Sequence, residues 1–201
     1  MEKSELNKSR VRKMTKVAML SALATILMLP PLEMLLPFMP PFLKMDFSDL
    51  PALVGAFALG PVSGIIIELF KNLIHLTMTQ SFGVGELANF VVGTVFVATA
   101  GYIYKFKRTK GRAILGMLFG TLAMTIASVI MNYFVMLPFY ATLFGMSMND
   151  IVAMTTKVNG LVNDVKTLIV FVFVPFNLFK GLVVSLITAL FYKRISPLLH
   201  R

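Results

Sequence analysis

Between Ala113 and Leu137 the chain runs for 25 residues without a single Asp, Glu, Lys or Arg. A helix on the surface of a soluble protein carries a polar face, and this run has none. It is also longer than the roughly 20 residues that span about 30 Å of hydrocarbon. Only 14% of the 201 residues are charged, against about 25% in soluble domains. The sequence therefore predicts an all-α integral membrane protein.

Six apolar runs are candidates for membrane-spanning helices, and the second of them is short. Pro30 and Pro31 should kink or stop the first run, and Gly60–Pro61 should separate the second from the third. Pro175 lies inside the last run. The six expected spans cover residues 14–36, 51–59, 62–78, 84–104, 113–137 and 165–191.

The basic residues gather at the ends of these runs. Six of the 19 Lys and Arg lie in residues 3–16, five in 105–112 and three in 193–201. Basic loops stay on the cytoplasmic side of a membrane, so an even number of crossings must separate each pair of blocks. Six crossings with both termini in the cytoplasm satisfy this rule. We expect one transmembrane domain over 1–201, with a bundle at 14–194 between tails at 1–13 and 195–201.

Several functional classes are excluded or disfavoured by the residues themselves. The chain has no Cys and two His, too few for thiolate or histidine-built metal sites. The clustering of the bases at span ends argues against a nucleic-acid surface. No GxSxG, HExxH or GxxxxGK[ST] motif occurs, so known hydrolase, zinc and ATP-binding signatures are missing. We expect a binding protein of the cell membrane, without catalytic activity or a cofactor.

Polar residues inside the spans are costly, at about 2.5–3.5 kcal/mol for a central charge, and need an explanation. Asn177 and Lys180 lie three positions apart and so share one helix face. They form either a ligand site or a structural ion pair, in which Lys180 would meet Glu68. The same two alternatives hold for the other intramembrane polar groups, which are Lys71, Asn72, His75, Glu86, Asn89, Asn132 and Tyr133.

Two further patterns concern surfaces. Ala18 and Ala22 form an AxxxA pair on the first span, and small residues four apart allow close helix contact. This pair is the best candidate for contact with another subunit, although most such pairs pack within their own bundle. In the outer segment 138–164, Ser147 and Asp150 have the spacing of a capping box. They predict a short helix over 147–156, which is either a mobile lid or a static cap.

The segment FLKMDFSDLPALVGAFALGP (42–61) is followed by Glu68-x-x-Lys71-Asn72, GELANF (85–90) and Asn177-x-x-Lys180. Together these resemble the substrate-binding S components of energy-coupling factor vitamin transporters, and most closely their riboflavin-specific members. The resemblance implies capture of riboflavin outside the cell and assembly with a transmembrane coupling subunit and two cytoplasmic ATPases. It also implies that Ala18 and Ala22 contact the coupling subunit.

The resemblance further implies that the binding site combines the loop after the first span with polar groups of the later spans. Glu68 is included as the alternative partner of Lys180. The expected binding residues are Phe42, Leu43, Lys44, Met45, Asp46, Glu68, Asn89, Asn132, Tyr133, Asn177 and Lys180. Another vitamin is the nearest alternative ligand. A membrane enzyme using the Glu68/Lys71/His75 stripe, or a purely structural subunit, is the alternative of a different class.

Overall fold

A computed structural model describes residues 2–37, 39–40, 43–79, 81–145 and 147–200 of the chain. Within them, helices make up nearly all of the regular structure. The elements are α1 Glu2–Leu27, η1 Pro30–Leu32, β1 Met34–Leu35, β2 Lys44–Met45, α2 Asp49–Leu59, α3 Pro61–His75, η2 Leu76–Met78, α4 Val84–Phe106, α5 Lys110–Met131, η3 Asn132–Met136, α6 Leu137–Phe144, α7 Met148–Thr156, α8 Val165–Leu168, η4 Ile169–Phe173 and α9 Val174–His200.

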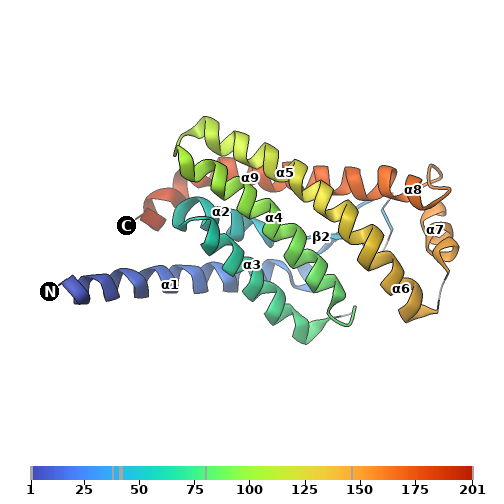
Figure 1. Ribbon diagram of the computed structural model, residues 1–201, viewed down its shortest axis with the longest axis horizontal. Coiled ribbons are helices and arrows are strands. Elements are labelled where there is room, and N and C mark those ends of the chain that lie inside the picture. Colours follow the sequence, from blue (N-terminus) through green and yellow to red (C-terminus); the bar gives the residue numbers. More distant parts are fainter. Residues whose placement is uncertain (1, 38, 41–42, 80, 146, 201) are drawn as a thin grey trace.

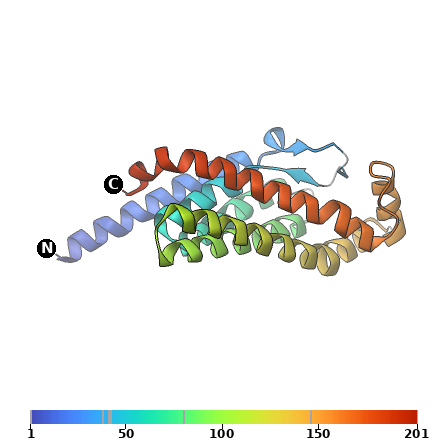
Figure 2. The ribbon, with the colours of Figure 1, turned by 90° about the horizontal axis from the view of Figure 1, so that it is seen from above.

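The long helices form an elongated bundle (Figures 1 and 2). The start of α1, the end of α9 and the connection between α4 and α5 lie at one end, and α7 lies at the other. In this bundle α4 packs against α3 and α5, while α9 packs against α5 and α2. The three basic blocks of the sequence therefore belong to one end of the molecule.

The contact between α4 and α5 is close because α5 presents glycines to it. A Cβ at Gly116 would lie 2.7 Å from the carbonyl oxygen of Ala100, and one at Gly120 would lie 2.9 Å from that of Phe96. Neither position has room for a larger residue. This small-residue pair thus serves packing inside the bundle.

Three helical stretches are long and apolar enough to cross a membrane among the described residues: Val84–Phe106, Lys110–Leu143 and Val165–Phe191. They confirm the expected apolar helices at 84–104, 113–137 and 165–191, while α2 and α3 are shorter. The second and third of these stretches each contain a π-helical turn, η3 and η4. Pro138 and Pro175 follow these turns closely; each lacks the N–H that a regular helix needs.

The first expected span and the loop after it differ from the prediction. Helix α1 ends at Leu27 rather than near Leu36, because Pro30 starts a separate turn, η1. The loop then folds back as a short antiparallel pair, in which Met34 faces Met45 and Leu35 faces Lys44. Among the described residues, the regular structure is therefore helical apart from this hairpin. Phe42 lies outside the described residues.

The predicted outer helix is confirmed as α7, and its first turn has the predicted cap. Asp150 N–H donates to the Ser147 hydroxyl at 3.2 Å, and Ser147 N–H donates to the Asp150 carboxylate at 2.7 Å. The same hydroxyl donates to that carboxylate, and these bonds lower the pKa of Asp150 below its usual value.

Two apolar cores hold the fold. One lies among α1–α5 and α9, and the other lies under α7 near η4.

Candidate functional site

Two adjoining cavities lie in the part of the bundle away from the termini. The outer cavity has a volume of about 460 Å³ and reaches from Met28 and His75 to Ile151. The inner cavity, of about 180 Å³, ends at Asn177 and Lys180. The outer cavity alone falls within the range of about 300–1,000 Å³ that is usual for small-molecule sites. The residues that line both are Lys44, Asp46, Gly85, Asn89, Asn132, Met136 and Tyr140.

Lys180 on α9 is held at the inner cavity by two carboxylates. Its Nζ lies 3.0 Å from Asp46 Oδ2 and 3.0 Å from Asp49 Oδ2. The alternative pairing of Lys180 with Glu68 is wrong, because Glu68 meets Lys71 on its own helix, one turn away. An ammonium has three N–H donors. Two of them face these carboxylates, which leaves one for a ligand.

A second buried lysine completes what we call the inner charge cluster: Asp46, Asp49, Glu68, Lys71 and Lys180. Lys71 Nζ donates to the Ser48 hydroxyl at 2.8 Å and to the Asp49 carboxylate. It also lies 2.8 Å from Glu68 Oε2, in an ion pair whose angles do not fit a hydrogen bond. Lys71 and Glu68 are both completely buried. Asp49 contacts both lysines and thereby joins α2, α3 and α9.

Asn132 and Asn177 are oriented by the same serine. Asn132 Nδ2 donates to the Ser128 carbonyl at 2.8 Å, and Asn177 Nδ2 donates to the Ser128 hydroxyl at 2.6 Å and the Phe173 carbonyl at 2.8 Å. A carbonyl oxygen can only accept a hydrogen bond, so the amide nitrogens must point to these partners. Both amide oxygens therefore remain as acceptors beside the cavities. Asn89 adds a third, because its Oδ1 is buried and has no partner among the described residues.

Seven of the predicted binding residues come together around the two cavities: Leu43, Lys44, Asp46, Asn89, Asn132, Asn177 and Lys180. Met45 is only 2% exposed but is not among the lining residues. Tyr133 is 46% exposed and packs edge-on against Phe134, away from both cavities. Glu68 lies behind the cavity in the inner charge cluster, and Phe42 lies outside the described residues.

The sequence reasoning missed other residues that line the cavities. Asp49 lies in the segment 42–61, three residues after Asp46, and this spacing was a usable signal. Tyr140 lies beyond the expected end of the fifth span and carried no such signal. It reaches both cavities because α6 continues the helix after η3.

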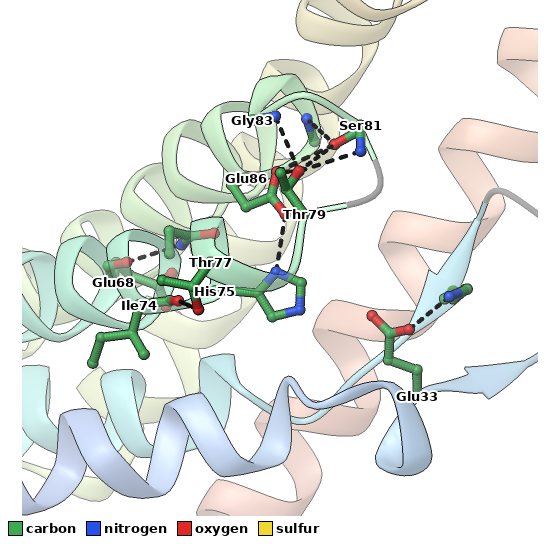
Figure 3. Close-up of polar contacts among 12 residues, drawn as sticks. Glu33, Glu68, Ile74, His75, Thr77, Thr79, Ser81, Gly83 and Glu86 are labelled. Atoms are coloured by element: carbon green, nitrogen blue, oxygen red, sulfur yellow. Dashed lines mark hydrogen bonds and ion pairs between the residues drawn. The ribbon is translucent and has the colours of Figure 1, made fainter.

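The Glu68/Lys71/His75 stripe does not act as one group. Glu68 and Lys71 belong to the inner charge cluster, whereas His75 turns to the α3–α4 connection (Figure 3). There His75 Nδ1 lies 2.9 Å from Glu86 Oε1. Among the described residues, no three His, Cys, Asp or Glu are grouped so as to hold a metal ion.

Ala18 and Ala22 lie on the exposed side of α1, away from these cavities. Their neighbours Met19 and Leu23 are 68% and 46% exposed, whereas Ala24 is completely buried. One face of α1 thus packs on the bundle, and the other presents small and apolar side chains outward.

Comparison with known proteins gives one consistent result. The chain is 38% identical to "Riboflavin transporter RibU" of Staphylococcus aureus (strain TCH60) over 98% of this chain and 97% of that protein. It is 35% identical to "Riboflavin transporter FmnP" of Bacillus subtilis (strain 168) over 94% of each. A solved structure described as "Structure and mechanism of the S component of a bacterial ECF transporter" covers 96% of this chain and 99% of its own. Its TM-score is 0.73 and its sequence identity 37%.

The family described as "ECF transporter, substrate-specific component" matches residues 12–192, which is nearly the whole chain. Its members, like the relatives above, are membrane transport proteins rather than enzymes. On this match the chain belongs to the substrate-specific components of ECF transporters.

Proposed function

We propose that this chain captures riboflavin on the outer side of the cell membrane and hands it to an ATP-driven transporter. The observation that carries the proposal is the polar end of the inner cavity. There one N–H of Lys180 remains for a ligand beside the acceptor oxygens of Asn132 and Asn177. The pyrimidine edge of isoalloxazine carries an N–H between two carbonyl groups. Lys180 can donate to a carbonyl, and an amide oxygen can accept from the N–H.

The remaining walls suit the rest of the ring system. The outer cavity is bordered by Leu137, Ile151, Met154 and Phe173 on the side of α6, α7 and η4. The dimethylbenzene end of isoalloxazine is apolar and gains from leaving water there. Tyr140 lines both cavities and offers an aromatic surface for the ring. The names of the relatives, two of which are riboflavin transporters, support this choice of vitamin.

The binding test measures the loss of riboflavin fluorescence during titration of the detergent-purified protein. An unmatched buried polar group costs about 1–3 kcal/mol. We therefore expect Asn177→Ala and Lys180→Ala each to weaken binding at least about tenfold, equivalent to roughly 1.4 kcal/mol. Lys180→Arg keeps the charge between its carboxylates and is the variant to use if Lys180→Ala does not fold.

Two exposed residues near α7 are matched controls for this test. Asn149→Ala and Lys157→Ala remove an Asn and a Lys side chain at exposed positions that do not line the cavities. These two variant proteins should bind riboflavin as tightly as the wild type does. Unchanged affinity in well-folded Asn177 and Lys180 variants would remove these residues from the site. If the wild type ignores riboflavin but binds another vitamin in a panel, the ligand assignment is wrong while the family stands.

We further propose a single transmembrane domain that crosses the membrane six times, with both termini in the cytoplasm. The supporting observation is that both chain ends and the basic α4–α5 connection lie at one end of the bundle (Figure 1). The cavities then open toward the outer side. Three basic blocks at a single end agree with the general charge bias of membrane proteins.

The exposed face of α1 is the proposed contact with the transmembrane coupling subunit, which joins two cytoplasmic ATPases. Ala18 and Ala22 leave room for a helix to approach closely. We expect Ala18→Phe together with Ala22→Phe to abolish riboflavin uptake in cells while leaving binding in detergent unchanged. Ile114→Phe, at an exposed position on α5 rather than on α1, is the control. A parallel loss of binding would show that this face packs inside the protein.

A further inference from the structure

His75 and Glu86 lie at one side of the outer cavity and are absent from the binding residues assigned above. Both line this cavity, together with Ser81 and Gly85. His75 is 9% exposed and Glu86 is 5% exposed. His75 ends α3 and Glu86 lies in the first turn of α4. A short connection therefore places both groups beside the ligand space.

Glu86 has its hydrogen-bonding capacity committed within this connection. Its Oε2 accepts from the Thr79 hydroxyl at 2.8 Å and from the Ser81 hydroxyl at 3.2 Å. Its Oε1 lies 2.9 Å from His75 Nδ1 (Figure 3). A carboxylate has acceptors and no proton to donate, so Glu86 also accepts the hydrogen bond in its contact with the ring. His75 therefore carries a proton on Nδ1.

This arrangement fixes the chemistry of the other ring nitrogen. In the tautomer with the proton on Nδ1, Nε2 is an acceptor. Nε2 is buried and has no hydrogen-bond partner among the described residues, and in Figure 3 it lies on the opposite side of the ring from the contact with Glu86. A buried acceptor without a donor costs free energy. A ligand in the outer cavity that carries a hydroxyl group supplies the missing donor.

The two sides of the outer cavity differ in polarity. The side formed by α6, α7 and η4 is apolar, whereas the side of the α3–α4 connection carries His75, Ser81 and Glu86. Lys44 and Glu33, which also line this cavity, pair with each other at 2.8 Å, and Nε2 accepts no hydrogen bond from any described residue. A ligand with an apolar ring and a hydroxylated chain is thereby oriented with its chain toward His75.

We propose that His75, held by Glu86, is a specificity-determining residue that accepts a hydrogen bond from a hydroxyl of the ligand's polyol chain. This inference rests on the proposed function, because riboflavin is the ligand that brings such a chain on a flavin ring. It names a subsite on the α3–α4 side, apart from the contacts of Lys180, Asn132 and Asn177 with the ring edge.

Lumiflavin separates this subsite from the ring site, because it has the same ring system with a methyl group in place of the ribityl chain. We expect His75→Leu to weaken riboflavin binding about tenfold, the effect of one unmatched buried acceptor or hydroxyl. Lumiflavin binding should stay within about twofold, a small fraction of such a hydrogen bond. His75→Gln should recover most of the loss, since its amide can donate to Glu86 and accept from the ligand.

The outcomes are distinct. A selective loss for riboflavin, with recovery in His75→Gln, supports the subsite. Equal loss for both flavins in folded protein means that His75 acts on the bundle or the ring site, and no loss for either means that the chain does not reach it. Both results overturn the inference. A wild type that binds neither flavin instead contradicts the proposed function.

Discussion

The two polar clusters of this molecule differ in how far apart their contacting residues lie in the sequence. In the inner charge cluster, Lys180 contacts Asp46 across 134 positions of sequence. At the outer cavity, His75 contacts Glu86 across 11 positions, with Thr79 and Ser81 between them. The inner charge cluster joins three helices. The outer cluster, which consists of His75, Thr79, Ser81 and Glu86, lies within the single connection between α3 and α4. The inner cluster therefore holds the bundle together, whereas the outer cluster affects only one part of the site.

This difference separates stability from specificity. In the inner charge cluster both lysines pair with carboxylates of the protein, and one N–H of Lys180 remains for a ligand. In the outer cluster Glu86 is saturated, but Nε2 of His75 has no partner among the described residues. Changes to the inner cluster should therefore affect folding and binding together. Changes to the outer cluster should affect the ligand's polar chain first.

The largest effect is expected from Lys71→Met, which leaves Asp49 and Glu68 buried with less compensation. Removing one partner of a buried ion pair costs about 3–5 kcal/mol. The thermal midpoint in detergent should fall sharply, as measured by loss of monomer on size-exclusion chromatography after heating. Lys157→Met, on an exposed lysine, is the matched control. If both variants melt as the wild type does, the inner charge cluster does not hold the helices together.

A smaller loss of stability is expected from Gly93→Ala. A Cβ at Gly93 would lie 2.4 Å from Glu68 Oε2 and 3.3 Å from Asp49 Oδ1. Because Lys71 holds these carboxylates, they cannot easily move, and overpacking of this kind costs about 1–3 kcal/mol. At Gly111 a Cβ would meet nothing within 4 Å, so Gly111→Ala should leave the thermal midpoint unchanged or slightly raised. Equal midpoints for the two variants would mean that the cluster yields to a methyl group.

Much of the fold was predictable because the bilayer imposes a simple rule on sequence. The charge-free run from Ala113 and the apolar runs beginning near Val84 and Val165 became the three spanning stretches. The capping pair Ser147 and Asp150 gave α7, since a cap depends on residues three positions apart. These features follow from local sequence alone. The family resemblance added the set of binding residues, seven of which meet around the cavities.

Features that depend on distant contacts were not predictable. Glu68 was the alternative partner considered for Lys180. Spacing within one helix does not show which of several carboxylates reaches a lysine on another helix, and Asp46 and Asp49 do so. Tyr133 was expected at the site because the family resemblance implied it. The π-helical turn that begins at Asn132 changes which side chains face inward, and Tyr133 lies outward there.

The smallest effect is expected in the outer cluster, from Thr79→Val. The Thr79 hydroxyl donates to Glu86 Oε2 at 2.8 Å and accepts from the N–H groups of Ser81 at 3.2 Å and Gly83 at 3.0 Å. Their loss should lower stability by about 1 kcal/mol, because the connection is partly exposed and water replaces some of these bonds. The Ser81 hydroxyl still donates to Glu86, so His75 keeps its orientation.

Riboflavin binding by Thr79→Val should therefore weaken by no more than about threefold, less than one full hydrogen bond is worth, and lumiflavin binding should not change. Thr77→Val is the matched control two residues earlier, since within the described part of the chain its exposed hydroxyl donates only to the Ile74 carbonyl of its own turn. Fluorescence titration with both flavins measures these differences. If Thr79→Val unfolds the protein as Lys71→Met does, the connection is not a local adjustment. In that case both clusters would be required to hold the bundle together. The inner charge cluster would then no longer differ from the outer cluster in its effect on folding.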